Sequence, residues 1–292
     1  MKKNSILIAI LSVLIIFASC KKDRIESQEL EQYNSIDNYF DQKKQQEQEY
    51  EIDSTGQNPL VGQQGTRIWL NKSKLMYQNG DSVDWTYTVK LIELYTIKDM
   101  VYYQMPSTSG NNLMTTEGVI RIRAFKDGEE LVLRQGASWP VEMPDTNQLQ
   151  DMKVFYGTGF EPNITWTQNG SFTNTSYGYA ANISPLGWVA CNKNIGVPAV
   201  SSISFTSETA DLTNVAIFIY IPDLQMLELV RNQQSTALPA GYQAKLFAIA
   251  INSSNQLFKF YKEVNITTAD LDVEVTLSQT TDADIETMLD NL

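Results

Sequence analysis

The sequence predicts an all-β protein with two antiparallel β-sandwich domains, which follow a signal peptide and a polar tether and end in a short C-terminal helix. After Pro59, short apolar and aromatic runs alternate with turn residues, as in strands joined by tight turns. The run from 83 to 95 also alternates apolar and polar residues with the period of two that is typical of a half-buried strand. We expect the two domains to span residues 59–160 and 161–292.

The first 19 residues have the three parts of an export signal. Lys2 and Lys3 form a basic start, an apolar core follows from 6 to 17, and small residues precede Cys20. This core is shorter than the stretch of about 20 apolar residues that spans a membrane. We therefore expect residues 1–19 to be removed and the Cys20 thiol to carry lipid, so that acyl chains hold the mature protein at a membrane. An ordinary secretory signal with an incidental cysteine is the alternative.

Residues 20–58 are rich in Gln, Glu, Lys and Asp and contain no Trp. Such a stretch buries too little apolar surface to offset the loss of chain entropy, which predicts a largely disordered, lipidated tether. Tyr33, Ile36, Tyr39 and Phe40 lie at helical spacing, so one or two short amphipathic turns are expected within it. A docking helix for a partner is the alternative to a solvated spacer.

The first domain is predicted to contain strands at 68–70, 83–95, 119–125, 131–133 and 152–156. Turn residues separate these runs. Asn79-Gly80 favours the positive φ values of a hairpin turn, and Lys126-Asp127-Gly128 has the composition of another turn. Short strands with this spacing are typical of an antiparallel sandwich of about 100 residues.

The second domain is predicted to contain strands at 164–167, 177–183, 187–191, 200–206, 215–221, 243–251, 256–261 and 271–277. The run from 215 to 221 is almost entirely apolar, as in a strand that is buried on both faces. The tail from 281 to 292 is expected to be helical, because Thr281 or Asp282 can cap a helix and apolar residues follow at helical spacing.

The composition disfavours most kinds of catalysis. The chain has no histidine, the commonest metal ligand and the commonest general base near neutral pH. With Cys20 lipidated, Cys191 has no disulfide partner and no histidine base, so it is expected to be a buried core residue. No run has the Asp-x-Asp-x-Asp-Gly spacing of a calcium loop, and we expect no metal, no cofactor and no enzyme activity. A glycoside hydrolase, which needs two facing carboxyl groups about 5–9 Å apart, is a further alternative.

The charge of the chain bears on its partners. The formal net charge is −12, and it becomes −14 without residues 1–19, which contain two lysines and no acidic residue. Such a chain repels the phosphates of nucleic acid, so we expect no nucleic-acid partner. Trp139 and Trp166 lie beside turn residues and are candidate platforms for a ligand such as a sugar ring; burial in the core is the alternative for both.

Several short motifs carry a resemblance: Gly65-Thr66-Arg67-Ile68, Asn79-Gly80, Glu93-Leu94-Tyr95, Lys98-Asp99-Met100, Ser107-Thr108-Ser109-Gly110, Thr116-Glu117-Gly118-Val119-Ile120 and Leu186-Gly187-Trp188-Val189-Ala190-Cys191. With these motifs, most of the chain from 60 to 292 resembles uncharacterised surface or periplasmic lipoproteins of Bacteroidota. Its N-terminal strands are distantly similar to the β-sandwich module of ankyrins and netrin receptors. This resemblance implies an envelope protein that contacts other proteins and has no active site.

The resemblance also implies candidate O-glycosylation at Ser54 and Ser82. Each serine follows an aspartate and precedes a threonine or an aliphatic residue. From the residues and the resemblance together, we expect a lipid-anchored cell-envelope protein with a non-catalytic protein-binding or scaffold role. A surface glycan-binding lipoprotein is the alternative. The expected partners are the membrane, through the lipid anchor, and envelope proteins or glycans. The resemblance implies the outer membrane as the site of the anchor, on either its periplasmic face or its cell-surface face.

Overall fold

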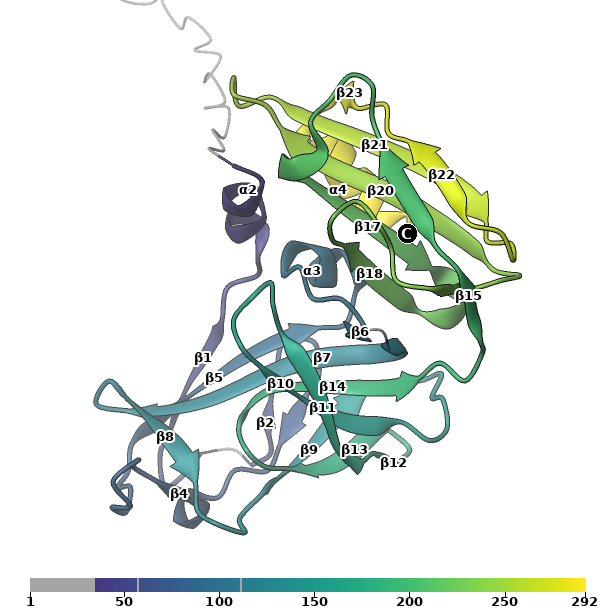
Figure 1. The fold of residues 1–292 in the computed structure, drawn as a ribbon. Coiled ribbons are helices and arrows are strands. Elements are labelled where there is room, and N and C mark those ends of the chain that lie inside the picture. The colour runs from purple at the N-terminus through teal and green to yellow at the C-terminus, as the bar shows by residue number, and fades with distance from the viewer. Residues whose placement is uncertain (1–34, 57, 111) are drawn as a thin grey trace, which may run out of the picture. The chain divides into compact units, whose positions relative to one another are not determined.

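The computed structural model describes residues 35–56, 58–110 and 112–292. The expected signal peptide and Cys20 lie outside the described residues. Within them the fold is mostly β, in several largely antiparallel sheets, and it ends in a short helix, as the sequence predicts (Figure 1).

Two sheets form an N-terminal sandwich. The larger sheet has nine strands in the order β1-β5-β7-β14-β10-β11, with β4, β6 and β8 paired at its side, and the smaller sheet has the order β12-β13-β9-β3-β2 (Figure 1). The larger sheet contains β1 (Gln48–Ile52), β4 (Leu75–Met76), β5 (Tyr87–Leu94), β6 (Thr108–Ser109), β7 (Asn112–Lys126), β8 (Glu129–Leu133), β10 (Lys153–Thr158), β11 (Thr165–Ser171) and β14 (Gly187–Asn194). The smaller sheet contains β2 (Leu60–Val61), β3 (Arg67–Ile68), β9 (Trp139–Pro144), β12 (Thr173–Asn174) and β13 (Gly178–Ile183).

The alternation of β5 explains how the larger sheet is covered on both faces. Tyr87, Val89 and Leu91 are buried in the sandwich core, the apolar cluster that also contains Trp139, Val141, Tyr179, Val189 and Cys191. Ile92 and Leu94 are buried in a different cluster, which lies against the C-terminal part of the chain. The period of two therefore predicts the strand correctly, and both faces are buried near its end.

The C-terminal part is built on a five-stranded sheet in the order β18-β17-β20-β21-β23. These strands are β17 (Val215–Ile221), β18 (Met226–Val230), β20 (Gln243–Ile251), β21 (Leu257–Asn265) and β23 (Ser278–Gln279). Two smaller pairs accompany it: β15 (Ala199–Ser201) with β19 (Leu238–Pro239), and β16 (Ile203–Thr206) with β22 (Leu271–Glu274), the last two being parallel. The short 3₁₀ helices are η1 (Lys72–Lys74), η2 (Leu212–Asn214) and η3 (Pro222–Leu224).

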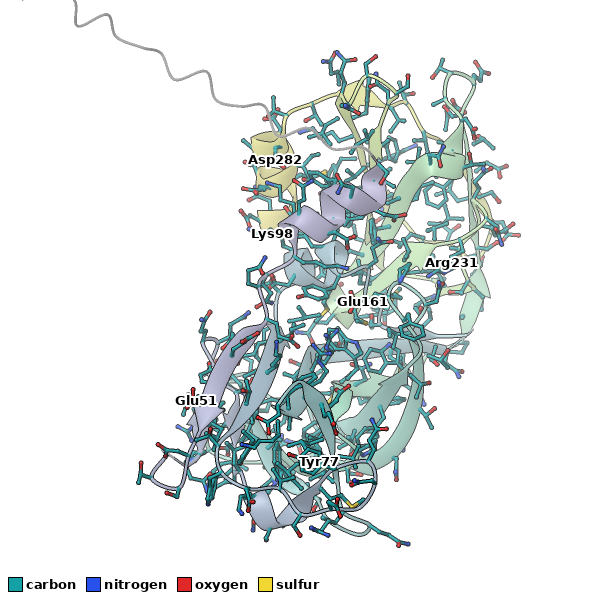
Figure 2. The ribbon with its side chains drawn as sticks, turned by 90° about the vertical axis from the view of Figure 1, so that its left-hand side faces the viewer. Glu51, Tyr77, Lys98, Glu161, Arg231 and Asp282 are labelled. Carbon is teal, nitrogen blue, oxygen red and sulfur yellow. The ribbon has the colours of Figure 1, made fainter. Side chains whose placement is uncertain are left out.

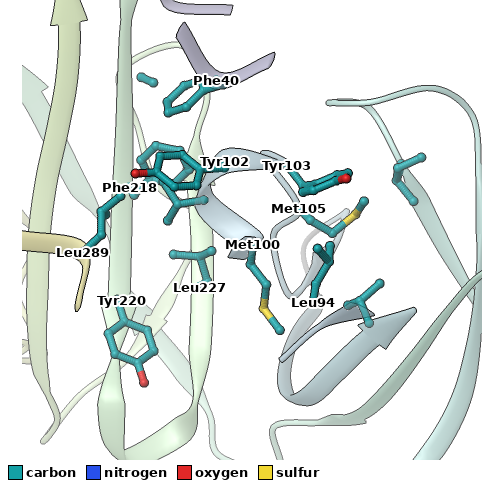
Figure 3. Close-up of a cluster of buried hydrophobic side chains, with 14 of the residues drawn as sticks. Phe40, Leu94, Met100, Tyr102, Tyr103, Met105, Phe218, Tyr220, Leu227 and Leu289 are labelled. Carbon is teal, nitrogen blue, oxygen red and sulfur yellow. The ribbon is translucent and has the colours of Figure 1, made fainter. Parts of the chain in front are cut away.

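Strand β17 is buried on both faces, as its apolar sequence predicts. Ile217, Ile219 and Ile221 pack in a C-terminal core with Phe205, Leu246 and Val273. Phe218 and Tyr220 point the other way, into the cluster that receives Ile92 and Leu94, which we call the central core (Figure 3). Helices α2 (Ile36–Lys43), α3 (Ile97–Tyr102) and α4 (Asp282–Asp290) contribute Phe40, Met100 and Leu289 to this core.

Helix α4 begins as predicted. The Thr281 side chain accepts a hydrogen bond from the backbone N–H of Asp284, and the Asp284 carboxylate accepts one from Thr281 in return. This capping box satisfies two N–H groups that have no partner within the helix. Ile285 and Leu289 then pack into the central core.

The prediction of a largely disordered tether over 20–58 is wrong for its second half. Residues 36–43 form α2 and residues 48–52 form β1, which pairs with β5. Tyr39 and Phe40 are completely buried in the central core. The stretch has few apolar residues, but these two aromatic side chains pack against strands and helices that are distant in sequence.

The predicted domain boundary at 160/161 is also wrong. Strand β14 lies between β7 and β10, and β11 pairs with β10, so residues as late as 194 complete the N-terminal sandwich. The C-terminal strands begin only at β15. The strand order depends on long-range pairing, which the spacing of strands along the chain does not reveal.

Candidate functional site

The two tryptophans predicted as ligand platforms are core residues. Trp139 has no exposed surface and packs in the sandwich core, where its indole Nε1 donates a hydrogen bond to the carbonyl of Asn71 at 3.4 Å. Trp166 is 4% exposed and belongs to the central core. They lie in different clusters, so the structure does not bring them together. The platform prediction is therefore wrong for both residues, because each ring faces inward from its strand.

The two serines predicted as modification sites are exposed. Ser54 lies in a turn after β1, where the Asp53 carboxylate accepts a hydrogen bond from the backbone N–H of Thr55 at 2.7 Å. The Ser82 hydroxyl accepts a hydrogen bond from Nη2 of Arg134 at 2.9 Å. Glycosylation of either residue stays a prediction.

Cys191 is buried in the sandwich core, as expected. Burial, reinforced by the charges of Glu117 and Asp145, raises the pKa of its thiol well above the ordinary value, so the reactive thiolate is disfavoured. Across the described ranges, no cluster of three or more His, Cys, Asp or Glu side chains is placed to hold a metal ion. No helix in the described part of the chain is both long enough and apolar enough to cross a membrane.

One pair of carboxyl groups is close enough to interact. Glu117, in β7, and Asp145, which follows β9, lie close enough for their charges to influence each other. Burial, together with this neighbour, raises the pKa of Glu117 to about 8. Oε1 of Glu117 and Oδ2 of Asp145 are buried without a hydrogen-bond partner.

The most exposed large apolar side chain of the described residues is Phe160, in the turn between β10 and β11. It is 89% exposed. The turn is tight, because the carbonyl of Phe160 accepts a hydrogen bond from the backbone N–H of Asn163 at 2.7 Å. Gly159 precedes it with φ +98°, and a Cβ at that position would lie 2.7 Å from the carbonyl oxygen of Asn163. Glycine is therefore needed where the chain enters this turn.

Glu161, the next residue, fixes the turn to two other segments. Its carboxylate accepts hydrogen bonds from Nζ of Lys44 at 2.8 Å and from Nη1 of Arg121 at 3.2 Å. Burial alone would lower the pKa of Lys44, but its hydrogen bonds to Asp41 and Glu161 raise it, so the ammonium form is favoured. The side chains of Lys44, Glu161 and Arg121 are each about a fifth exposed. Water and salt therefore screen these ion pairs less than they screen fully exposed pairs.

Arg121 is itself held in place. Glu47 binds both Arg121 and Arg123, with its Oε2 2.7 Å from Nη2 of Arg123. The guanidinium of Arg121 lies 5.2 Å from the centre of the Trp188 ring, and the edge of this ring meets Tyr103 with centroids 5.9 Å apart. Such cation–π and aromatic contacts stabilise a partly buried arginine in one orientation.

The turn is also joined to the C-terminal sheet. Nη2 of Arg231 donates a hydrogen bond to the carbonyl of Pro162 at 2.9 Å (Figure 2). Ile164 and Trp166, which leave the turn, are buried in the central core. We call residues 159–163 the Phe160 turn. Side chains from the end of α2, from β7 and from the end of β18 hold its backbone in place. Phe160 is therefore exposed on a turn that has one fixed conformation.

A hollow of about 560 Å³ adjoins the turn. Its lining includes Pro162, Arg231, Ile36, Ile217 and Leu229.

Phe160 is not among the residues predicted from the sequence, because only tryptophans were expected to supply exposed aromatic rings. The signal that could have found it is a large aromatic residue inside Gly159-Phe160-Glu161-Pro162-Asn163, a segment that otherwise consists of turn and charged residues.

No protein-family model, curated protein or solved structure matches the chain.

Proposed function

We propose that the chain is a non-catalytic, lipid-anchored cell-envelope protein that binds another protein through the Phe160 turn. The observation that carries this proposal is the exposure of Phe160, at 89%, on a backbone held by three separate segments. Burial of a phenylalanine side chain contributes about 1.5–3 kcal/mol. A preorganised turn delivers that contribution with little loss of entropy on binding.

The net charge of the whole chain favours a protein partner over an anionic lipid surface. The chain carries a formal net charge of −12. An anionic lipid surface repels such a chain. A partner with an apolar pocket for the phenyl ring, rimmed by polar groups, fits both features.

The expected lipid at Cys20 fixes the compartment of the proposed partner. We therefore propose an envelope protein as the partner.

The proposal is tested by affinity recovery from cells that produce the full chain. Phe160→Ala is expected to lower the recovery of one specific envelope protein at least tenfold relative to the wild-type chain. The control is Val200→Ala, which trims an apolar side chain that is 50% exposed on β15. Equal recovery with wild type and Phe160→Ala would overturn the role of the turn.

A further inference from the structure

A second surface lies on the outer face of the smaller sheet, apart from the Phe160 turn. Side chains that point outward from four neighbouring strands form one row across this face. In register, Thr173 lies opposite Ala180, Ala180 opposite Glu142, and Glu142 opposite Arg67. The alternation of each strand places these four side chains on the same side, away from the sandwich core.

A second row runs beside the first. Asn182 of β13 lies opposite Pro140 of β9, and the backbone N–H of Trp69 donates a hydrogen bond to the carbonyl of Pro140 at 3.0 Å. Trp69 is two residues after Arg67 and therefore points outward as well. Its ring is half-buried, whereas Asn182 is exposed.

The two rows enclose a shallow groove of about 490 Å³, lined by Trp69, Pro140, Glu142, Thr173, Ala180 and Asn182. Ala180 contributes only a methyl group between its longer neighbours Thr173 and Glu142, which leaves the face hollow at this point. The groove is open to solvent, so it suits an extended ligand that lies on the sheet.

Glu142 is fixed within the groove. Its Oε1 accepts a hydrogen bond from the hydroxyl of Thr175 at 2.6 Å, and its Oε2 accepts one from Nη1 of Arg67 at 3.2 Å. The Arg67 guanidinium in turn lies 3.4 Å from the centre of the Tyr177 ring. Each carboxylate oxygen keeps a further lone pair, which can accept a hydrogen bond from a ligand hydroxyl.

We propose that this groove binds an uncharged oligosaccharide, with one sugar ring lying on Trp69. A sugar ring has an apolar face of C–H groups, which suits the Trp69 indole and Pro140, and a rim of hydroxyl groups, which suits Glu142, Asn182 and Thr173. The charge of Glu142 is paired with that of Arg67, and no residue that lines the groove is cationic, so the groove offers an anionic ligand no charge partner. This site is independent of the proposed role of Phe160.

The test uses the mature chain with Cys20→Ser, which removes the expected lipid and keeps every other residue. Affinity electrophoresis in gels that contain xylan, mannan, a β-glucan or an α-glucan measures binding to neutral polysaccharides, and a polygalacturonate gel serves as the anionic comparison. At least one neutral polysaccharide is expected to retard the chain. Failure of all four neutral polymers to retard it, or retardation by polygalacturonate alone, would overturn the proposal.

The variants locate the site. Trp69→Ala is expected to weaken binding at least tenfold, and Ala180→Leu, which fills the groove without removing any contact, is expected to abolish it. Asn182→Ala, at an exposed position, gives a second test that does not depend on replacement of a tryptophan. The control is Trp85→Ala, because Trp85 is 42% exposed and stacks on Tyr87 outside the groove. Undiminished binding by both Trp69→Ala and Ala180→Leu would contradict the assignment. Phe160→Ala is expected to bind normally, so the two sites can fail separately.

Discussion

At the scale of single residues, exposure separates the aromatic side chains that form the fold from those that are free to bind. Phe160 and Trp166 are six positions apart and lie on the same turn-and-strand segment. One is 89% exposed and the other is 4% exposed. Composition and spacing identify both as aromatic residues near turns, but only the three-dimensional packing shows which ring points outward.

This difference predicts opposite effects of truncation. Phe160→Ala is expected to change the free energy of unfolding by less than about 0.5 kcal/mol, because the side chain has few contacts to lose. Trp166→Ala is expected to lower it by about 3–5 kcal/mol, since it leaves a cavity in the central core. Denaturant unfolding of the two variants measures both values. A large loss for Phe160→Ala would mean that the ring is part of the core.

The pH dependence of stability should reveal the raised pKa of the buried Glu117 carboxyl group. Burial and this neighbour raise the folded pKa of Glu117 to about 8, above its ordinary value of 4.5. The folded state therefore binds more protons than the unfolded chain between these values. The stability from this group is fully present below pH 4.5 and is lost as the pH rises through 8. Lys193, which lowers this pKa, opposes the effect only in part.

Glu117→Gln, which cannot ionise, is expected to flatten the fall in unfolding free energy between pH 5 and pH 9, as measured by urea unfolding at a series of pH values. Glu130→Gln, at an exposed position of β8, controls for the change in net charge. The buried Glu228 has a pKa raised by burial to about 7 and will keep part of the slope in both variants. An unchanged slope in Glu117→Gln would contradict the assignment.

At the scale of elements, local patterns predict strands and caps well and predict burial of polar segments poorly. The alternation in 83–95, the apolar run at 215–221 and the cap at Thr281 each correspond to an element of the structure. The helical spacing of Ile36, Tyr39 and Phe40 was also visible, but α2 was expected in a solvated spacer. Its partners come from α3, α4 and β17, so no local signal marks this helix as part of the core.

Helix α2 is therefore expected to stabilise the fold. Phe40 is completely buried and meets the ring of Phe218 edge-on, with centroids 6.2 Å apart. Phe40→Ala should lower the free energy of unfolding by about 3–5 kcal/mol. Gln42→Ala, on the exposed side of the same helix, should change it by less than about 0.5 kcal/mol. Equal stability of the two variants, measured by denaturant unfolding, would show that α2 is only loosely attached.

At the scale of the whole molecule, the class of fold was predictable and the division into domains was not. The sequence patterns are local, whereas the pairing of β14 with β7 joins segments more than 60 residues apart. The candidate sites depend on the same long-range order. The Phe160 turn is held by residues from α2, β7 and the C-terminal sheet, and the groove at Trp69 combines side chains from four strands. Neither constellation is contiguous in the sequence.

The central claim is that Phe160 is an anchor for a protein partner, and photo-crosslinking in intact cells tests it most directly. A photoreactive phenylalanine analogue at position 160 of the full chain, or at position 200 as control, is activated by light, and adducts are identified by mass spectrometry. We expect one dominant protein adduct from position 160 that is absent from position 200. No adduct at position 160, or the same set of adducts from both positions, would contradict the claim.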